Sequence, residues 1–486
     1  MTRYDLCVLG AGPAGLAAAV RAHDLGKTVA LVDGGRAGGA GIWDGALSSK
    51  TAWHLSGDFA RARRTDRGYR GGLVTLAWDE VRDQVRAACD EASALVQRQL
   101  AYLAAPSPRG GRVDHIPGRA RFIAPDAVEI SGPTPRRIDA ERFLVAVGSR
   151  PRPLPDIAID GERILTSDHV DHLAAPPASL AIIGGGVVGC EYATIFGQFG
   201  ATAVELLDRQ PRILPSEDDD VASVIAARFA ALGIAIHRQA RLEAIAVTGD
   251  GVDLTIRAAT DGGGEAIIQR RVARVLVAIG RVPDTAALGL DAAGVRTTAS
   301  GAIVVDGTRS TSPRVWAAGD VTADIMLVNM AEIEARHAVA DMFGLDPPPI
   351  SYDAQSAIYF LSPELASVGL GEHAARQKGI PFRAAVISNR LLRRSIAMRA
   401  TDGFVKLLAH RDGRLLGLRV VGPQACSCIQ GVALLIAGGG TLDDLDRCVH
   451  PHPAITEGVQ EAARLLLGNS LYKPGAVGDL ARIVEG

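Results

Sequence analysis

The spacing of hydrophobic and polar positions predicts both strands and helices near the start of the chain. An apolar run over Tyr4–Leu9 predicts a buried strand, which a helical stretch over Leu16–Leu25 and a second strand over Thr28–Val32 follow. Farther along, the spacing predicts a long amphipathic helix over residues 78–104, with an apolar stripe made of Val81, Val85, Cys89, Ala92 and Val96. Strands that alternate with helices in this way are typical of an α/β fold.

The same order of elements recurs later in the chain. Leu180–Ile183 predicts a strand, a helix runs through Phe199, and a further strand ends near Asp208. A glycine-rich turn joins strand to helix in both copies. The repeat therefore predicts two similar nucleotide-binding units, each on a parallel sheet.

Both turns carry three glycines at the same spacing, namely Gly10, Gly12 and Gly15 in the first copy and Gly184, Gly186 and Gly189 in the second. The first glycine permits a tight turn, the second lets the backbone approach a pyrophosphate, and the third lets helix and strand pack closely. An acid that can bond a ribose hydroxyl follows each turn, since Asp33 lies 23 residues after the first glycine of its copy and Asp208 lies 24 after its own. Two complete copies argue against the alternative of glycine turns without a ligand.

Composition and charge narrow the classes of function. Of 486 residues, 48% are hydrophobic and 22% are charged, as in ordinary globular proteins. The formal net charge of −2 gives no reason to expect nucleic acid as a partner. No apolar run approaches the roughly 18 residues of a spanning helix. Because the first residues show no basic segment followed by an apolar one, we expect a cytoplasmic protein without a membrane span.

The cysteines and lysines add two details. The six cysteines are scattered and show no metal-ligand spacing, so we expect reduced thiols and no metal site. Lysine occurs only five times, and arginine supplies the other 47 of the 52 basic residues. A lysine in this chain is therefore an informative choice.

Further segments resemble, in order, those of the pyridine nucleotide–disulfide oxidoreductase family, the flavoproteins that include dihydrolipoamide dehydrogenase and glutathione reductase. The similar segments are the two glycine-containing crossovers Val145–Pro151 and Val277–Asp284, the second flavin motif Thr311–Asp320, the interface-domain segments Ser362–Glu364 and Gly403–Gly422, and the His–Glu signature His450–Glu457. The resemblance covers nearly the whole chain.

The resemblance implies FAD in the first unit and a nicotinamide nucleotide in the second. The residues that would bind FAD are Gly10, Gly12, Gly15, Asp33, Lys50, Gly148 and Asp320, and those that would bind the nicotinamide nucleotide are Gly184, Gly186, Gly189, Asp208 and Gly280. Asp208 favours NAD, because its carboxylate bonds the ribose hydroxyls and repels the 2′-phosphate of NADP. Arg209 and Arg212 follow and leave NADP open; a solvated turn is the alternative for both arginines.

The resemblance also divides the chain into domains. Residues 1–150 and 282–345 would form the FAD domain, residues 151–281 the NAD(P) domain, and residues 346–486 a C-terminal interface domain that makes a homodimer. The expected fold class is α/β, with two Rossmann-like dinucleotide-binding domains and an α+β dimerisation domain.

One departure from the family matters for the chemistry. Family members carry Cys-x4-Cys and then Ser-Lys after the second flavin strand, and the cysteine nearer the flavin passes electrons to a substrate disulfide. Here the spacing up to Ser49 and Lys50 is kept, but Gly41 and Ala46 occupy the two cysteine positions. Thiol–disulfide exchange needs an attacking thiolate, so dihydrolipoyl dehydrogenase activity is not expected.

Other cysteines are poor substitutes for the missing pair. Cys426 and Cys428 are two apart in a predicted helix and therefore point to different sides. Cys190 lies in the nucleotide-binding helix, where we expect packing. Cys448 lies two residues before His450 and is the candidate that a dimer interface would bring near a flavin.

The chain keeps Lys50 and Glu191 at positions where the family forms an ion pair beside the flavin N5 and the nicotinamide. A compact ammonium at that point stabilises negative charge on reduced flavin. The alternative is a surface lysine and a glutamate that favours a helix N-terminus. The matched positions of both residues favour the ion pair.

His452 and Glu457 match the family's catalytic pair. Pro453 suits the first position of a helix, which would place Glu457 in the first helical turns, where it fixes the tautomer of the imidazole. In the family this histidine reaches the flavin of the other subunit, which implies a homodimer with shared active sites. Without a thiol to serve, His452 protonates a different acceptor or braces the interface.

Two tryptophans and an aspartate lie in or after the altered stretch. Trp43 would either cover the space left by the cysteines or stack on an aromatic acceptor. For Trp43, Asp44 and Trp53 alike, the alternative is packing without a functional role.

These patterns favour an FAD-dependent NAD(P)H oxidoreductase that passes electrons directly to a small, quinone-like acceptor near His452. A soluble transhydrogenase, which moves hydride between NADH and NADP⁺, is a second hypothesis. A flavin-binding subunit without turnover is a third hypothesis. Four retained residues argue against it, namely Lys50, Glu191, His452 and Glu457.

Overall fold

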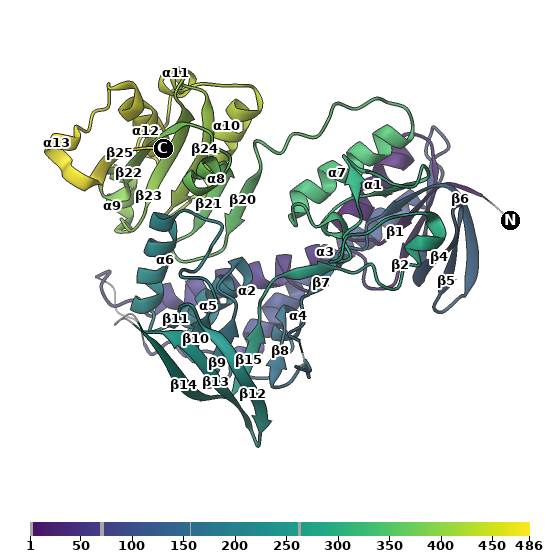
Figure 1. The fold of residues 1–486 in the computed structure, drawn as a ribbon, viewed down its shortest axis with the longest axis horizontal. Coiled ribbons are helices and arrows are strands. Elements are labelled where there is room, and N and C mark those ends of the chain that lie inside the picture. Colours follow the sequence, from purple (N-terminus) through teal and green to yellow (C-terminus); the bar gives the residue numbers. More distant parts are fainter. Residues whose placement is uncertain (1–2, 69–71, 156, 261–263) are drawn as a thin grey trace.

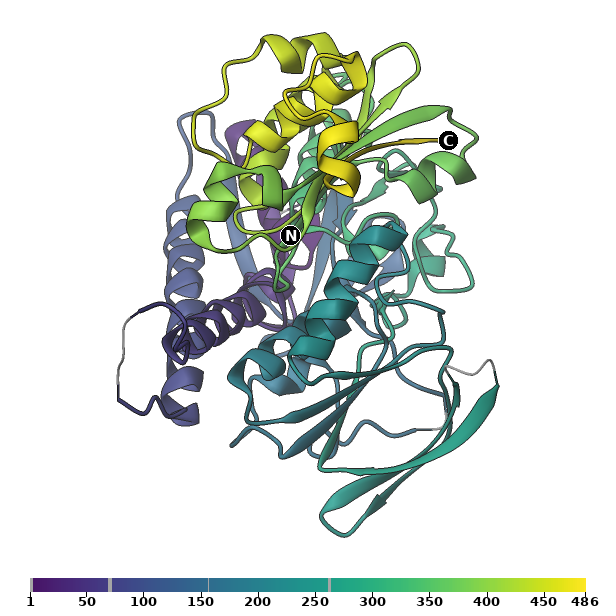
Figure 2. The same ribbon diagram turned by 90° about the vertical axis from the view of Figure 1, so that its left-hand side faces the viewer.

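The structure is a computed structural model that describes residues 3–68, 72–155, 157–260 and 264–486. The chain forms three lobes, with both the N-terminal segment and the segment around α7 (Val328–Met342) in the right-hand lobe of Figure 1. The teal middle of the chain forms the lower lobe, and the C-terminal lobe stands above it (Figures 1 and 2). The middle of the sequence is thus inserted between two parts of the first lobe.

The first lobe is built on a nine-stranded sheet. Its main order is β17 (Val305–Asp306), β18 (Arg309–Ser310), β19 (Val315–Ala317), β6 (Arg136–Val145), β1 (Tyr4–Leu9), β2 (Thr28–Asp33) and β3 (Arg112–Pro117), with β4 (Arg119–Ala124) and β5 (Ala127–Ser131) joined through β6. From β19 to β3 the pairs are parallel. Helices α1 (Pro13–Asp24) and α7 pack together on one face, so the central strand β1 is buried.

The second lobe repeats this design. Its five parallel strands follow the order β11 (Ala235–His237), β10 (Ala203–Leu207), β9 (Ser179–Ile183), β15 (Arg274–Val277) and β8 (Ile164–Leu165), and its helices are α4 (Ser167–Val170), α5 (Val187–Phe199) and α6 (Asp219–Ala231). An antiparallel sheet of β12 (Arg241–Thr248), β13 (Gly251–Ala259) and β14 (Glu265–Val272) covers one side. Two short strands, β7 (Ser149–Pro151) and β16 (Arg281–Pro283), pair where the chain crosses between the two lobes.

The third lobe is an α+β domain. Its antiparallel sheet follows the order β20 (Ser356–Tyr359), β21 (Leu365–Gly369), β24 (Leu415–Val421), β23 (Phe404–His410), β22 (Phe382–Ser388) and β25 (Ala481–Glu485). The helices are α8 (Glu372–Gln377), α9 (Arg393–Met398), α10 (Cys426–Ala437), α11 (Leu442–Arg447), α12 (Glu457–Leu467) and α13 (Pro474–Val477). Buried side chains of α10 and α12 pack on this sheet and form the core of the lobe.

Two helices that precede the inserted lobe tie the lobes together. Helix α2 (Ala46–Ala62) packs against both α3 (Trp78–Leu103) and α5. The predicted helix over 78–104 is confirmed, and Val85 and Cys89 of its stripe are buried. The predicted strands and turns of both nucleotide-binding units are confirmed as well, as is the α/β fold class with a C-terminal α+β domain. The domain boundaries near residues 150, 282 and 346 stay a prediction.

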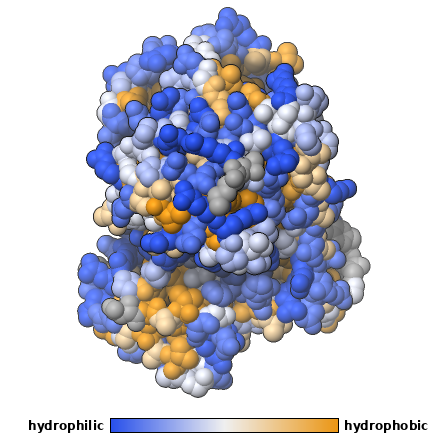
Figure 3. Space-filling view, turned by 90° about the vertical axis from the view of Figure 1, so that its right-hand side faces the viewer, coloured by the Kyte–Doolittle hydropathy of each residue, from blue (hydrophilic) through white to orange (hydrophobic). Residues whose placement is uncertain are grey.

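Figure 3 views the molecule from the right-hand side of Figure 1 and shows a mostly hydrophilic face with a few separate apolar groups. Among the described residues, no helix is both long and apolar enough to cross a bilayer.

Candidate active site

The first glycine turn lies between β1 and α1 and touches the neighbouring crossover. A Cβ atom on Gly10, whose φ is +105°, would lie 2.4 Å from the carbonyl oxygen of Ala146, and one on Gly15 would lie 1.8 Å from the Gly10 oxygen. Only glycine fits at these two positions. Nothing lies within 4 Å of a Cβ on Gly12, which lines a cavity at the N-terminus of α1. The exposed N–H groups of a helix N-terminus suit a pyrophosphate.

The cavity beside this turn has a volume of about 300 Å³, and Asp33, Gly148 and Asp320 are among its lining residues. A second hollow of about 340 Å³ also has Asp33 in its wall. The Oδ2 atom of Asp33 is buried and has no hydrogen-bond partner among the described residues. A buried acceptor without a partner fits a ribose hydroxyl. The open cradle at Gly12 and this acceptor together match what FAD requires.

Two polar residues of this cavity were not predicted. The Ser149 hydroxyl donates a hydrogen bond to Asp320 Oδ2 at 2.5 Å, and Nε of Arg281 donates to Ser149 Oγ at 2.7 Å. Both residues line the cavity. The signal was present in the sequence, because each follows directly after a crossover glycine, Gly148 or Gly280.

Lys50 and Glu191 form an ion pair in the wall of the same cavity. Lys50 comes from α2 and Glu191 from α5, and Nζ lies 2.8 Å from Oε2. The glutamate side chain is 7% exposed and the lysine side chain 27%. The packing of α2 against α5 therefore sets a positive and a negative charge side by side at the cavity surface.

Gly41 and Ala46 lie in the wall of this cavity, together with Asp44. No cysteine is among the described residues that line it. A Cβ atom on Gly41 would lie 2.7 Å from Cγ of Pro13, so a larger residue there needs a local shift. The wall that contains the ion pair therefore offers no thiol.

Trp43 packs beside the altered stretch and is not a lining residue of the cavity. The Arg36 guanidinium lies 4.1 Å from the centre of its ring, and the indole N–H donates to the Ala37 carbonyl at 3.3 Å. Arg36 also pairs with Asp44 at 3.2 Å. Of the three predicted roles for Trp43, packing is the one that these contacts favour.

The second glycine turn repeats the geometry of the first. A Cβ atom on Gly184 would lie 2.3 Å from the Ala278 oxygen, and one on Gly189 would lie 1.9 Å from the Gly184 oxygen. A Cβ on Gly186 would again face open space. Gly184, Gly186 and Gly280 line a cavity of about 1160 Å³. The residues present thus fit a second dinucleotide.

Asp208 lies in the wall of this second cavity, directly after β10. Its two carboxylate oxygens accept backbone N–H groups, Oδ2 from Gly185 at 2.5 Å and Oδ1 from Gln210 at 2.6 Å. The carboxylate is therefore fixed at the position where a ribose hydroxyl of the coenzyme would bind.

The two arginines after Asp208 differ in their surroundings. Arg209 is exposed and lines the cavity. Arg212 is half-buried, donates to the carbonyl oxygens of Leu214 and Glu217, and pairs with Asp219 at 2.9 Å. Arg212 thus holds the loop together, and the solvated-turn alternative is wrong for this residue.

His452 and Glu457 are in contact on the third lobe. Glu457 Oε1 lies 2.7 Å from His452 Nδ1, and Oε2 accepts the Ala454 N–H at 2.8 Å. The predicted helix start at Pro453 is wrong, because α12 begins at Glu457 with Thr456 as its N-cap, but the predicted place of Glu457 in the first helical turn is confirmed. The Glu457 side chain turns back and accepts the Ala454 N–H, so it ties the segment ahead of the helix to the first helical residue.

The electrostatics of this pair follow from the same contacts. Burial raises the pKa of Glu457, but the hydrogen bonds from His452 and the Ala454 N–H outweigh it, and the pKa lies below its usual value. Glu457 is therefore an ionised acceptor near neutral pH. The His452 side chain is 58% exposed and leaves one ring nitrogen for another molecule.

The cysteines of the structure are free thiols. Burial raises the pKa of Cys190 far above its usual range and that of Cys428 to about 12, and it also raises the pKa of Cys426. Cys89, behind the altered stretch, donates to the Ile42 carbonyl at 3.2 Å, and burial raises its pKa to about 11. Thiols with raised pKa values supply little thiolate at neutral pH.

Comparisons with known proteins show which family this chain is similar to. A family model described as pyridine nucleotide-disulphide oxidoreductase matches residues 4–335. The chain belongs to this family. A second model, the dimerisation domain of the same family, matches residues 355–463 and supports a homodimer. Enzymes of this family are flavin-dependent oxidoreductases that use FAD and NAD(H).

Curated relatives match along nearly the whole chain. Dihydrolipoyl dehydrogenase 3 of Haloarcula marismortui is 31% identical over 469 residues, which are 95% of this chain and 96% of that protein. Dihydrolipoyl dehydrogenase of Geobacillus stearothermophilus is 32% identical over 472 residues, 96% of this chain and 97% of the relative.

Solved structures show the same architecture. LpdA from Mycobacterium tuberculosis superimposes with a TM-score of 0.84 at 29% identity, and the match covers 96% of this chain and all of the other. The Cu(II) complex of RclA from Escherichia coli, an HOCl-induced flavoprotein disulfide reductase, has a TM-score of 0.83 at 25% identity, with coverage of 96% and 100%.

Proposed function

We propose that this family member is an NAD(P)H oxidoreductase that delivers two electrons directly to a small, quinone-like acceptor instead of a disulfide. The supporting observation is the wall of the first cavity, where the Lys50–Glu191 pair stands with Gly41 and Ala46 and no described lining residue is a cysteine. FAD, when bound, supplies the two-electron relay between nicotinamide and acceptor. The net reaction consumes NADH, one proton and the acceptor, and it yields NAD⁺ and an acceptor reduced by two electrons and two protons.

The chain's own residues would bind and orient the two cofactors. The N-terminus of α1 beside Gly12 holds a pyrophosphate, and Asp33 accepts a ribose hydroxyl. Asp208 does the same for the nicotinamide nucleotide in the second cavity. The Lys50 ammonium, held by Glu191, stabilises negative charge that develops in the first cavity during reduction.

His452 is the proposed proton donor to the acceptor. Its contact with ionised Glu457 holds one proton on Nδ1, so that in the imidazolium form the second proton lies on Nε2, outward from the pair, and this is the proton given to the acceptor. In a homodimer we expect this exposed nitrogen to reach the first cavity of the partner subunit. The acceptor site would then be completed by both subunits.

The relatives named dihydrolipoyl dehydrogenase suggest a different substrate, a dithiol. The first cavity argues against it, because positions 41 and 46 supply no sulfur and the buried thiols elsewhere have raised pKa values. Transhydrogenation is disfavoured by Asp208 and by Arg212, whose donors the loop already uses. A subunit without turnover would need neither the second cavity nor the Lys50–Glu191 pair.

Anaerobic titration of the purified protein with NADH, followed by flavin absorbance, tests the proposal. We expect complete bleaching after about two electrons per flavin, without a thiolate-to-flavin charge-transfer band. A Cys448→Ser variant should behave identically. Uptake of about four electrons with that band, or rapid turnover with dihydrolipoamide, would overturn the proposal.

A further inference from the structure

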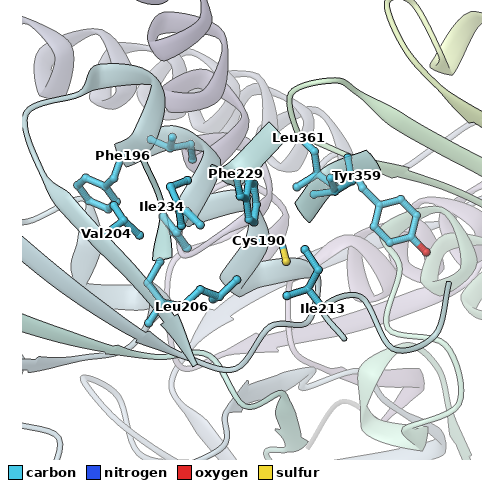
Figure 4. Close-up of a cluster of buried hydrophobic side chains, with 14 of the residues drawn as sticks. Cys190, Phe196, Val204, Leu206, Ile213, Phe229, Ile234, Tyr359 and Leu361 are labelled. Carbon is cyan, nitrogen blue, oxygen red and sulfur yellow. The ribbon is translucent and has the colours of Figure 1, made fainter. Parts of the chain in front are cut away.

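A segment of the third lobe reaches the ion pair of the first cavity. Figure 4 shows Tyr359 and Leu361 from this segment beside Cys190 and Phe229 of the second lobe, in one hydrophobic cluster. Phe360 lies between them, and its backbone N–H donates to Glu191 Oε1 at 3.0 Å. Both carboxylate oxygens of Glu191 are therefore engaged, since Oε2 binds Lys50.

The side chain of Phe360 contacts the other member of the pair. Lys50 Nζ lies 4.9 Å from the centre of the Phe360 ring, within the range of a cation–π interaction. Lys50 Nζ also donates to Ser49 Oγ at 3.2 Å. The ammonium is thus held from three directions, by Glu191, by Ser49 and by the aromatic face.

Trp53 fixes the segment that carries Phe360. It follows Lys50 by three residues on α2, and its indole N–H donates to the Leu361 carbonyl at 3.1 Å. Its ring meets the Phe360 ring edge-on, with centres 5.3 Å apart and planes at 85°. The contact joins the dimerisation lobe to the helix that bears the lysine, at the point where the ammonium stands.

We infer that Phe360, clamped by Trp53, is a positioning residue for the Lys50–Glu191 pair, so that docking of the third lobe sets where the Lys50 ammonium stands in the cavity wall. The inference deepens the proposed function and rests on it for the role of the ammonium. An ammonium displaced from this position stabilises negative charge on reduced flavin less. It also holds Glu191, the other member of the pair, less firmly beside the nicotinamide.

The test compares Phe360→Leu, Phe360→Tyr and Trp53→Phe with the wild type. Trp78→Phe is the matched control, because the Trp78 indole N–H also donates to a carbonyl, that of Leu173 at 2.8 Å. Two quantities are measured: the midpoint potential of bound FAD under chemical reduction without NADH, and the rate of flavin reduction by NADH in a stopped-flow instrument. FAD content and Tm are recorded for every variant.

Phe360→Leu should slow flavin reduction about three- to tenfold, the scale of one cation–π contact. Its midpoint potential should fall by up to about 30 mV, the equivalent of a tenfold change in a two-electron equilibrium. Phe360→Tyr should restore both values, Trp53→Phe should shift both in the same direction, and Trp78→Phe should leave both unchanged.

Wild-type values for rate and potential in Phe360→Leu and Trp53→Phe would overturn the inference and leave the proposed function standing. If NADH fails to reduce the wild-type flavin, the proposed function fails, while a shifted potential in Phe360→Leu still supports the positioning role. If Phe360→Leu does not retain FAD, the same measurements on Trp53→Phe decide the inference, because that variant has an aromatic ring at both positions.

Discussion

Glu457 holds the imidazole of His452 through Nδ1 at 2.7 Å, ahead of the first turn of α12. An ionised carboxylate can only accept a hydrogen bond, so Nδ1 carries the proton and Nε2 is the nitrogen left for a substrate. Burial raises the pKa of Glu457, but its hydrogen bonds lower the pKa by more. The carboxyl group therefore stays ionised near neutral pH and keeps the proton of the imidazole on Nδ1.

Replacing His452 by Asn should lower turnover with the acceptor by about 100-fold or more, because a general acid is lost. Glu457→Gln should also lower turnover, since an amide carries no charge to fix the tautomer. Neither change should alter the rate at which NADH reduces the flavin, which stopped-flow measurement separates from turnover. The matched control is His410→Asn, since His410 Nδ1 pairs with Asp412 at 2.9 Å elsewhere on the third lobe. A loss of turnover in the control, or none in His452→Asn, would contradict the assignment.

Restoring the two cysteines should not by itself restore a disulfide reductase. In Gly41→Cys/Ala46→Cys the new Cβ at position 41 would lie 2.7 Å from Cγ of Pro13. The overlap should destabilise the protein by about 1–3 kcal/mol, as overpacking does, and lower Tm. Adding Pro13→Ala removes the colliding atom and should recover part of the lost Tm. Full dihydrolipoamide activity in the double variant, with an unchanged Tm, would contradict the prediction. It would show that the stretch differs from the family only in lacking the two thiols and still has room for them.

Asp208 should set the choice of coenzyme. Asp208→Asn keeps an oxygen acceptor for one of the two backbone N–H groups that Asp208 binds and removes the negative charge. The KM for NADH should rise about tenfold, the loss expected for one charged hydrogen bond, and the preference for NADH over NADPH should become smaller. Steady-state kinetics with both coenzymes measure this. Asp291→Asn, which changes another carboxylate lining the same cavity, is the control and should leave the preference unchanged.

The local pattern of the sequence was enough to predict the glycine turns and the strands around them. Gly15 and Gly189 are required by a contact within the same turn, because a Cβ atom there would meet the carbonyl oxygen of Gly10 or Gly184, five residues earlier. The ion pair of Lys50 and Glu191 was predicted only through the family resemblance, because the two residues lie 141 positions apart.

Phe360 had no local signal at all. Its role depends on how the third lobe packs against α2 and α5, and a phenylalanine at the end of a strand is ordinary in the sequence. The start of α12 was misplaced for a related reason. Pro453 favours a helix start, but the Glu457 side chain accepts the Ala454 N–H and ties the preceding segment to the first helical residue, which no propensity describes.

A buried lysine links the second and third lobes and gives the last prediction. The Lys406 side chain is fully buried, and its ammonium lies 2.9 Å from Asp218, 2.5 Å from Asp220 and 2.7 Å from Glu372. The three carboxylates lie close enough to hold a metal ion, but the lysine stands among them. Burial lowers the pKa of Lys406, yet the charges of Asp218 and Asp220 outweigh it, and the pKa is raised. Burial likewise opposes the effect of Lys406 on Asp218, whose pKa is nevertheless lowered.

The two shifts fix the pH dependence of the free energy of unfolding. The raised pKa of Lys406 contributes stability that is complete below the unfolded lysine value, about 10.4, and is lost as the pH rises through the raised value. The lowered pKa of Asp218 contributes stability that is present above the unfolded value, about 3.9, and is lost as the pH falls through the lowered one. Stability from this cluster should therefore be flat between about pH 5 and pH 9 and fall on both sides.

Lys406→Met should remove this plateau. Asp218 would then be buried without its cation, whereas Asp220 and Glu372 keep Arg482 and Arg376, and the protein should be destabilised by about 3–5 kcal/mol at pH 8, the cost of breaking a buried ion pair. Because protonation removes the uncompensated charge of Asp218, the difference from wild type should shrink as the pH falls toward 4.5. Urea unfolding at several pH values measures both effects, with the exposed Lys378→Met as the control. An equal difference at pH 8 and pH 4.5 would show that the loss reflects packing of the lysine stem and not its charge.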